Sequence, residues 1–125
     1  MIKQLGDLHA LPDETSKSVE SLLFGKRVVV FGGIGRDHYW PLLRDAGVKD
    51  SDYRWYEGYK TISQARTAEI VGWCDLVVVI TSYAGHLLLY QTREVLSKGQ
   101  VLLLIHNSGV GTLRQQILEK FKKSD

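Results

Sequence analysis

Short runs of aliphatic and β-branched residues alternate with stretches whose apolar residues recur at helical spacing, from Lys26 onward. The apolar runs predict strands at 27–31, 53–56, 76–81 and 101–106. The stretches between and after them predict helices at 38–46, 62–73, 84–97 and 112–122. The first, third and fourth strands are continuous apolar runs, which is typical of strands covered on both faces.

This alternation predicts right-handed βαβ crossovers and a parallel sheet. We therefore expect an α/β fold, a three-layer Rossmann-like or flavodoxin-like doubly wound parallel sheet with strand order 2-1-3-4. The single domain would span residues 25–125, after a partly helical N-terminal appendage at 1–24. In that appendage Val19, Leu22 and Leu23 form a weak apolar stripe, which is the basis for expecting a homodimer.

Composition narrows the classes of partner. The chain has 125 residues, the size of one domain, and 16 basic against 14 acidic residues. A net charge of +2 does not favour nucleic acid or a membrane surface as a partner. Cys74 is the only cysteine, so no internal disulfide can form, and we expect a small buried side chain there. No apolar run is long enough to span a bilayer, and we expect a cytoplasmic protein.

In a parallel sheet, the loops that leave the strands emerge at one edge, and ligands bind there. These loops are GGIGRDHY at 32–39, EGYKT at 57–61, SYAGH at 82–86 and HNSGVGT at 106–112. Glycines let the backbone approach a ligand, and helix N-termini favour an anion. The sequence therefore predicts an anion site at this edge, with basic side chains from several loops.

The first of these loops raises the question of a phosphate-binding turn. From Gly33 it follows the pattern G-x-G-x-x-H, with His38 where the dinucleotide fingerprint has its third glycine. Glu57 lies 22 positions after Gly35, near the spacing of a ribose-binding acid. Ligand contact and a plain tight turn explain the glycines about equally well. No P-loop sequence occurs, which argues against hydrolysis of nucleoside triphosphates.

The third loop leads into a helix with a possible catalytic group. His86, Tyr90 and Arg93 follow the spacing of one helix face, and Ser82 is a natural N-cap for that helix. A half-exposed helix face explains the three residues as well as a functional histidine does. The histidines show no metal-ligand spacing, so we expect no metal, and the sequence identifies no cofactor.

The segment from Lys26 to about Phe121 resembles the bacterial family catalogued as domain of unknown function 2325 (DUF2325). The matching stretches are VVVFGGIGRDHYWPLLRDAG, YEG, WCDLVVVITSYAGH and LLLIHNSGVGTL. The resemblance implies that the family's motif positions are occupied here by Gly32, Gly33, Glu57, Gly58, His86, Ser108 and Gly109. Many members carry cysteines before the helix-opening histidine, and this chain has none there. The resemblance implies the same fold and clustered loops, and it implies no reaction.

We therefore expect a small-molecule-binding regulatory or sensor module for an anionic, nucleotide-like ligand, either a nucleotide or a phosphorylated metabolite. The expected ligand-binding residues are Gly32, Gly33, Gly35, Arg36, His38, Glu57, Lys60, Ser82, His86, Asn107, Ser108 and Gly109. One alternative is a small hydrolase or transferase that acts on a nucleotide with His86 as acid or base. A further alternative is a protein-interaction module without a ligand.

Overall fold

The computed structural model describes residues 21–58, 60, 62–107 and 109–121. The predictions for the N-terminal residues 1–20, for Tyr59 and for Ser108 lie outside the described residues.

Four parallel strands form one sheet in the order β2-β1-β3-β4, which confirms the predicted fold class and strand order. The strands are β1 (Val28–Gly32), β2 (Tyr53–Glu57), β3 (Leu76–Ile80) and β4 (Val101–Ile105). Every residue of β1 and β3 is buried, because these strands are central and covered on both faces. The edge strands β2 and β4 are partly exposed.

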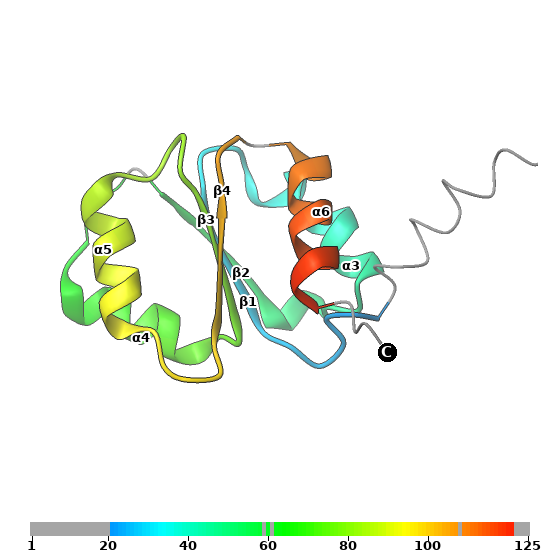
Figure 1. The fold of residues 1–125 in the computed structure, drawn as a ribbon, viewed down its shortest axis with the longest axis horizontal. Coiled ribbons are helices and arrows are strands. Elements are labelled where there is room, and N and C mark those ends of the chain that lie inside the picture. The colour runs from blue at the N-terminus through cyan, green and yellow to red at the C-terminus, as the bar shows by residue number, and fades with distance from the viewer. Residues whose placement is uncertain (1–20, 59, 61, 108, 122–125) are drawn as a thin grey trace, which may run out of the picture.

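Helices cover both faces of the sheet and complete the three layers (Figure 1). On one face lie α4 (Gln64–Trp73) and α5 (His86–Val95), and on the other lie α3 (Trp40–Asp45) and α6 (Val110–Phe121). Successive strand residues point to opposite faces, so β1 contributes to two cores. Val28 and Val30 pack in the core with α3 and α6, whereas Val29 and Phe31 pack in the core with α4 and α5.

The first helical segment is shorter than its predicted range of 38–46. A 3-10 turn over Arg36–His38 comes first, and α3 begins only at Trp40. Pro41 lies in the first turn of α3, where its missing N–H removes no intrahelical bond. The chain then turns at Gly47, whose φ of 101° is the left-handed conformation that commonly ends helices.

The helix α5 begins two residues later than predicted, and its cap differs from the predicted one. Its N-cap is Gly85, with no side-chain capping bond, and Ser82 does not cap it. The reason is a turn directly after β3, in which the N–H groups of Tyr83 and Ala84 both donate to Ile80 O at 3.0 Å. Ser82 lies inside that turn and therefore too early to cap the helix.

The residues just before β1 pack against the α3 side of the domain. Leu23 is fully buried in the core, and its N–H donates to Ala46 O at 2.8 Å. Leu22 packs partly against the same core. Leu22 and Leu23 therefore pack against the domain, on the far side of the boundary that the sequence predicted at residue 25. Because the monomer itself uses these two leucines, they do not support the predicted homodimer, and Val19 lies outside the described residues.

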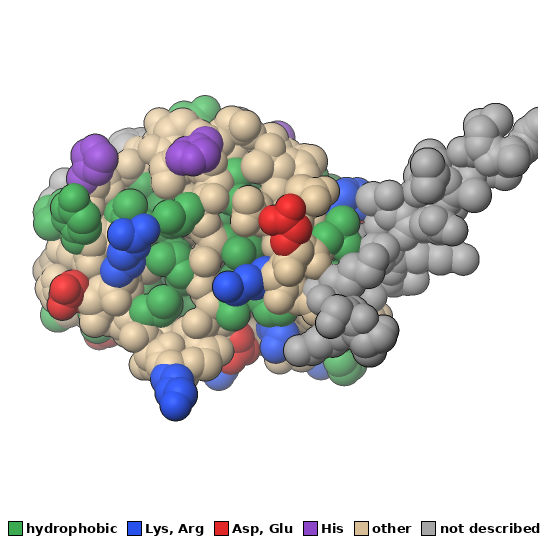
Figure 2. Space-filling view, viewed as in Figure 1, with side chains coloured by type: hydrophobic (Ala, Val, Ile, Leu, Met, Phe, Trp, Pro, Cys, Tyr) green, Lys and Arg blue, Asp and Glu red, His purple; other side chains and the backbone are tan. Residues whose placement is uncertain are grey.

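Hydrophobic side chains also gather on the surface over α5 and β4 (Figure 2). Leu87 and Tyr90 of α5 are 55% and 59% exposed, and Leu102 and Leu104 of β4 are half-buried. The outer edge of β4 pairs with no strand in the described part of the chain. Unlike β2, which carries Arg54, this edge strand has no charged side chain to discourage association.

Candidate functional site

The loops that follow the four strands meet at one edge of the sheet, which we call the rim. The N–H of Gly58 donates to Gly32 O at 2.9 Å and joins the loops after β1 and β2. The ring of Tyr83 packs on Gly33 and joins the loops after β1 and β3. Thr81 Oγ1 and His106 Nδ1 lie 3.1 Å apart, so the loops after β3 and β4 also touch.

The Gly32–Gly33 turn faces an aromatic ring. A Cβ atom on Gly33 would overlap the ring of Tyr83, so this close approach requires glycine. A Cβ atom on Gly32 would lie 3.3 Å from Trp55 Nε1. Gly35 is different, because nothing lies within 4 Å of its Cβ position. Packing inside the protein therefore accounts for Gly33, and the sequence had no means of showing that Tyr83 is its neighbour.

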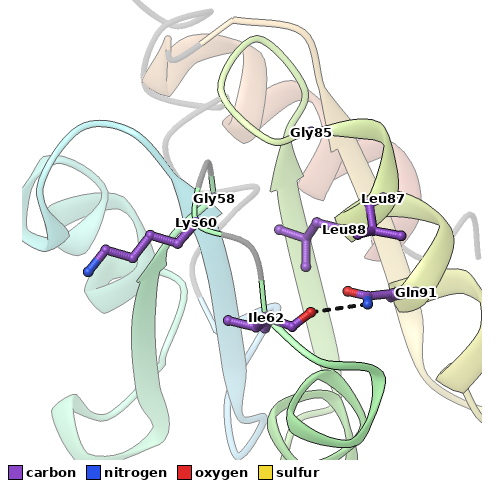
Figure 3. Close-up of a pocket in the computed structure, with 7 residues that line it drawn as sticks. All are labelled: Gly58, Lys60, Ile62, Gly85, Leu87, Leu88 and Gln91. Carbon is purple, nitrogen blue, oxygen red and sulfur yellow. Dashed lines mark hydrogen bonds between the residues drawn. The ribbon is translucent and has the colours of Figure 1, made fainter.

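Glu57 and Lys60 come together at the end of β2. Lys60 Nζ lies 3.0 Å from Glu57 Oε1. Glu57 is half-buried and Lys60 is exposed. In Figure 3 the Lys60 side chain extends away from Leu88 and Gln91, so its ammonium group stands outside the hollow between these loops. The pair places one carboxylate and one cation at the rim, close to where the sequence predicted them.

The Arg36 side chain is directed away from the rim, toward the start of β2. Arg36 Nη2 donates to Asp50 Oδ1 at 2.9 Å and to the carbonyl oxygens of Asp50 and Tyr53 at 3.3 Å. Its guanidinium also lies over the Tyr53 ring, 4.5 Å from the centroid. Burial raises the pKa of the Tyr53 hydroxyl, which donates to Arg36 O at 2.8 Å. Arg36 thus fixes the turn before α3 against β2 and contributes no cation to the rim.

His38 follows Arg36 in the same 3-10 turn and is exposed. Its ring packs edge-on against Tyr39 at a centroid distance of 4.7 Å. The predicted helix would have begun at His38, whereas the observed turn places it before α3. His38 therefore lies on the α3 side of the rim.

His86 is the first residue of α5 and is exposed. Its ring lies 6.5 Å from that of Tyr90, and Arg93 is also exposed, so the predicted face of His86, Tyr90 and Arg93 points to solvent. His86 lines a hollow of about 80 Å³ together with Thr81 and Leu89. A histidine in this place is accessible to a ligand at the rim.

Asn107 organises the turn before α6. Its Oδ1 accepts from the Gly109 N–H at 2.8 Å and from Thr112 Oγ1 at 3.3 Å. The amide oxygen is thus used inside the loop, as in the Asx turns that asparagine commonly forms. Asn107 and Gly109 are both exposed at the rim.

A groove opens beside the end of β2, between the first turn of α4 and the start of α5. Its larger part is a cavity of about 280 Å³ lined by Phe31, Trp55, Tyr56, Ile62, Ile70 and Leu88, with the charged residues Glu57, Lys60 and Arg66. A hollow of about 40 Å³ adjoins it, lined by Gly58, Lys60, Ile62, Gly85, Leu87, Leu88 and Gln91 (Figure 3). Both parts share Lys60, Ile62 and Leu88, and we describe them together as the groove.

A hydrogen-bonded network forms one wall of the groove. Gln91 is only 8% exposed, and its Nε2 donates to Ile62 O at 3.1 Å (Figure 3). The fully buried Thr67 donates from Oγ1 to Gln91 Oε1 at 3.1 Å. These bonds tie α5 to α4 and to Ile62, two residues before α4. Buried polar groups that are satisfied in this way make the wall rigid.

Arg66 supplies the second basic side chain of the groove. It lies in the first turn of α4, which begins when Ser63 Oγ accepts from the Arg66 N–H at 3.1 Å. Its guanidinium lies 3.1 Å from Glu69 Oε1 and 5.9 Å from the centroid of the Tyr56 ring. Both Arg66 and Glu69 are exposed, so this ion pair is open to exchange with an anionic ligand.

The structure therefore brings only part of the predicted set to the groove. Of those residues, Glu57 and Lys60 line it, whereas His86 lines the neighbouring hollow that shares Gly85 with it. The sequence analysis missed Tyr56, Ile62 and Arg66. A signal was available, because Ile62 precedes the capping Ser63 and Arg66 follows that serine by three positions, in the first turn of the helix.

Two features are absent from the described residues. No three His, Cys, Asp or Glu side chains gather there as a group that could hold a metal ion. No helix in that part of the chain is long and apolar enough to cross a membrane.

Comparison with known proteins identifies no relative of this chain. No protein-family model matches the chain, and no match was found among curated proteins or among solved structures.

Proposed function

We propose that this protein is a small-molecule-binding regulatory or sensor module, and that it binds an anionic, ring-bearing ligand in the groove. A nucleotide or a phosphorylated metabolite has this chemistry. The observation that carries the proposal is the 280 Å³ cavity, which combines aromatic and aliphatic walls with basic side chains at the carboxyl edge of a parallel sheet.

Each part of the groove suits one part of such a ligand. The rings of Phe31 and Tyr56, with Ile62, offer apolar contact to a base or another flat ring. Arg66 offers charge to an anionic group, and Lys60 adds a second cation at the edge of the groove, where it pairs with Glu57. Glu57 offers carboxylate oxygens to ligand hydroxyls, as the acid at the end of the second strand does in dinucleotide-binding folds.

This proposal moves the ligand from the glycine turn after β1 to the loop after β2. The reason is that Tyr83 packs on Gly33, whereas space is available beside β2. Membership of the DUF2325 family, a cytoplasmic location and a homodimer remain predictions.

The test is thermal stabilisation by a panel of AMP, GMP and ribose 5-phosphate, with adenosine as the probe without phosphate. A ligand present at 100 times its Kd should raise the free energy of unfolding by about 2.7 kcal/mol. Ile62→Trp fills the cavity and should abolish the shift. Leu118→Trp, at a half-buried position on α6 across the sheet, is the matched control and should keep it. If no phosphorylated probe stabilises the protein, the ligand-binding proposal is wrong and the interaction-module alternative gains support.

A second function is favoured by the position of His86. It is exposed at the start of α5 and lines a hollow next to the groove, where it could act as acid or base on a bound nucleotide. An enzyme of this kind would lose turnover of its nucleotide in the His86→Ala variant while keeping much of its affinity. A pure binding module would show no turnover in either protein.

A further inference from the structure

Two buried hydrogen-bond donors have no partner among the described residues. They are the hydroxyl of Tyr39 and the indole Nε1 of Trp55. Tyr39 is 0% exposed, so its hydroxyl has no direct access to solvent. Buried polar groups of native proteins are nearly always paired, and an unpaired one costs free energy, so both atoms require an explanation.

The indole donor lies under the Gly32–Gly33 turn, and Tyr39 packs with the same core as Trp55. Trp55 Nε1 is 3.3 Å from the position that a Cβ on Gly32 would take. Tyr39 lies near Tyr83, since the pKa of the Tyr39 hydroxyl is raised by burial and further by Tyr83. Both side chains pack with the core of α3 and α6, on the face of the sheet opposite Phe31, and Trp55 also lines the groove.

The ring of Tyr83 covers this turn. It packs on Gly33 so closely that a side chain at this position would have to displace the ring. It is also 38% exposed and belongs to the turn between β3 and α5, so an outward rotation would carry it into solvent. Such a rotation would uncover a glycine-lined turn with Trp55 Nε1 beneath it.

We propose that the Gly32–Gly33 turn is a second ligand site, closed by Tyr83, and that it takes an oxyanion such as a phosphoryl or carboxylate group. With the ring rotated outward, a ligand oxygen accepts from Trp55 Nε1 and from the Tyr39 hydroxyl. The two glycines let the backbone approach that oxygen. The site shares Trp55 with the groove, whereas Gly32, Gly33 and Tyr39 do not line the groove.

The experiment is calorimetric titration with inorganic phosphate, and with acetate as the carboxylate probe. Tyr39→Phe and Trp55→Phe each remove one donor and should weaken binding of the preferred probe about tenfold. Tyr83→Ala removes the cover and should tighten binding. Tyr90→Ala, which removes a more exposed tyrosine on α5, is the control and should bind like the wild type. Ile62→Trp should also leave this binding unchanged, which separates the turn from the groove.

A second readout uses the protein without any probe. Because the Tyr39 hydroxyl makes no hydrogen bond with the described residues, Tyr39→Phe should leave the melting temperature unchanged or raise it. A lower melting temperature would mean that a buried water already satisfies the hydroxyl and would overturn the proposal. Equal affinity of the wild type, Tyr39→Phe and Trp55→Phe for the probes, or no binding of either probe even by Tyr83→Ala, would overturn it as well.

Discussion

Cys74 illustrates how burial decides the chemistry of a single side chain. The thiol is buried at the end of α4, where its Sγ lies 3.3 Å from Val71 O. Burial, with a further contribution from the nearby Asp75 charge, raises the pKa of the thiol to about 11. Little thiolate is then present at neutral pH, and thiolate is the reactive form. Cys74 therefore acts as a small apolar side chain in the core.

The same pKa predicts how stability depends on pH. The unfolded thiol ionises near 9.0 and the folded one near 11, so between these values only the native state keeps the proton. Unfolding then releases a proton, and the free energy of unfolding falls as the pH rises from about 9 to about 11. From pH 8 to pH 10, the urea midpoint of unfolding should therefore fall less for Cys74→Ala than for the wild type. An equal fall in both proteins would contradict this assignment.

Single-residue roles were the hardest feature to predict from the sequence. Basic character alone suggested that Arg36 serves the rim, but its partner Asp50 comes from a turn that no local pattern places beside it. Gly33 faces Tyr83, which is fifty positions away along the chain. Such roles depend on contacts between distant segments, and neither propensity nor spacing records them.

At the scale of elements, the starts of α4 and α5 differ in how they are capped. Ser63 Oγ accepts from the Arg66 N–H in α4, whereas Gly85 begins α5 without a side-chain cap. We predict that Ser63→Ala lowers the free energy of unfolding by about 1 kcal/mol. Ser82→Ala is the matched control at the exposed turn before α5 and should change it by less than about 0.5 kcal/mol. Urea denaturation of both variants measures the difference. Equal losses of unfolding free energy would show that the Ser63 cap does not stabilise α4.

The strands were predicted more accurately than the helix starts, for a physical reason. Each strand end lies within one residue of its predicted position, since the buried apolar runs coincide with the strands. Helix starts depend on the turn before them. The turn after Ile80 uses two N–H groups and delays α5 to His86, and the 3-10 turn at Arg36 delays α3 to Trp40.

At the scale of the whole molecule, topology was predictable and the groove was not. Alternating strands and helices allow few arrangements of a parallel sheet, and the order 2-1-3-4 with a shared rim is one of them. The groove instead exists because the side chains of Phe31, Ile62 and Leu88 leave space between α4, α5 and β2. Cavities of this kind follow from side-chain packing across three elements, which no pattern along the chain specifies.

The last prediction concerns the residues before β1, and asks whether the part of the chain that unfolds cooperatively begins with them. Leu23 is fully buried with α3 and α6, whereas its neighbour Phe24 is 71% exposed. Leu23→Ala in the full chain should therefore lower the free energy of unfolding by about 2–5 kcal/mol, because it leaves a cavity in the core.

Phe24→Ala is the matched control, since it removes a larger side chain from the adjacent position with little loss of burial. We expect it to change the free energy of unfolding by less than about 0.5 kcal/mol. Urea unfolding followed by tryptophan fluorescence measures both variants, because Trp40 and Trp55 pack against the same core as Leu23. A small effect of Leu23→Ala would mean that residues 21–24 rest on the domain without contributing to its stability. A large effect would show that the segment contributes to the stability of the fold through the buried Leu23 side chain.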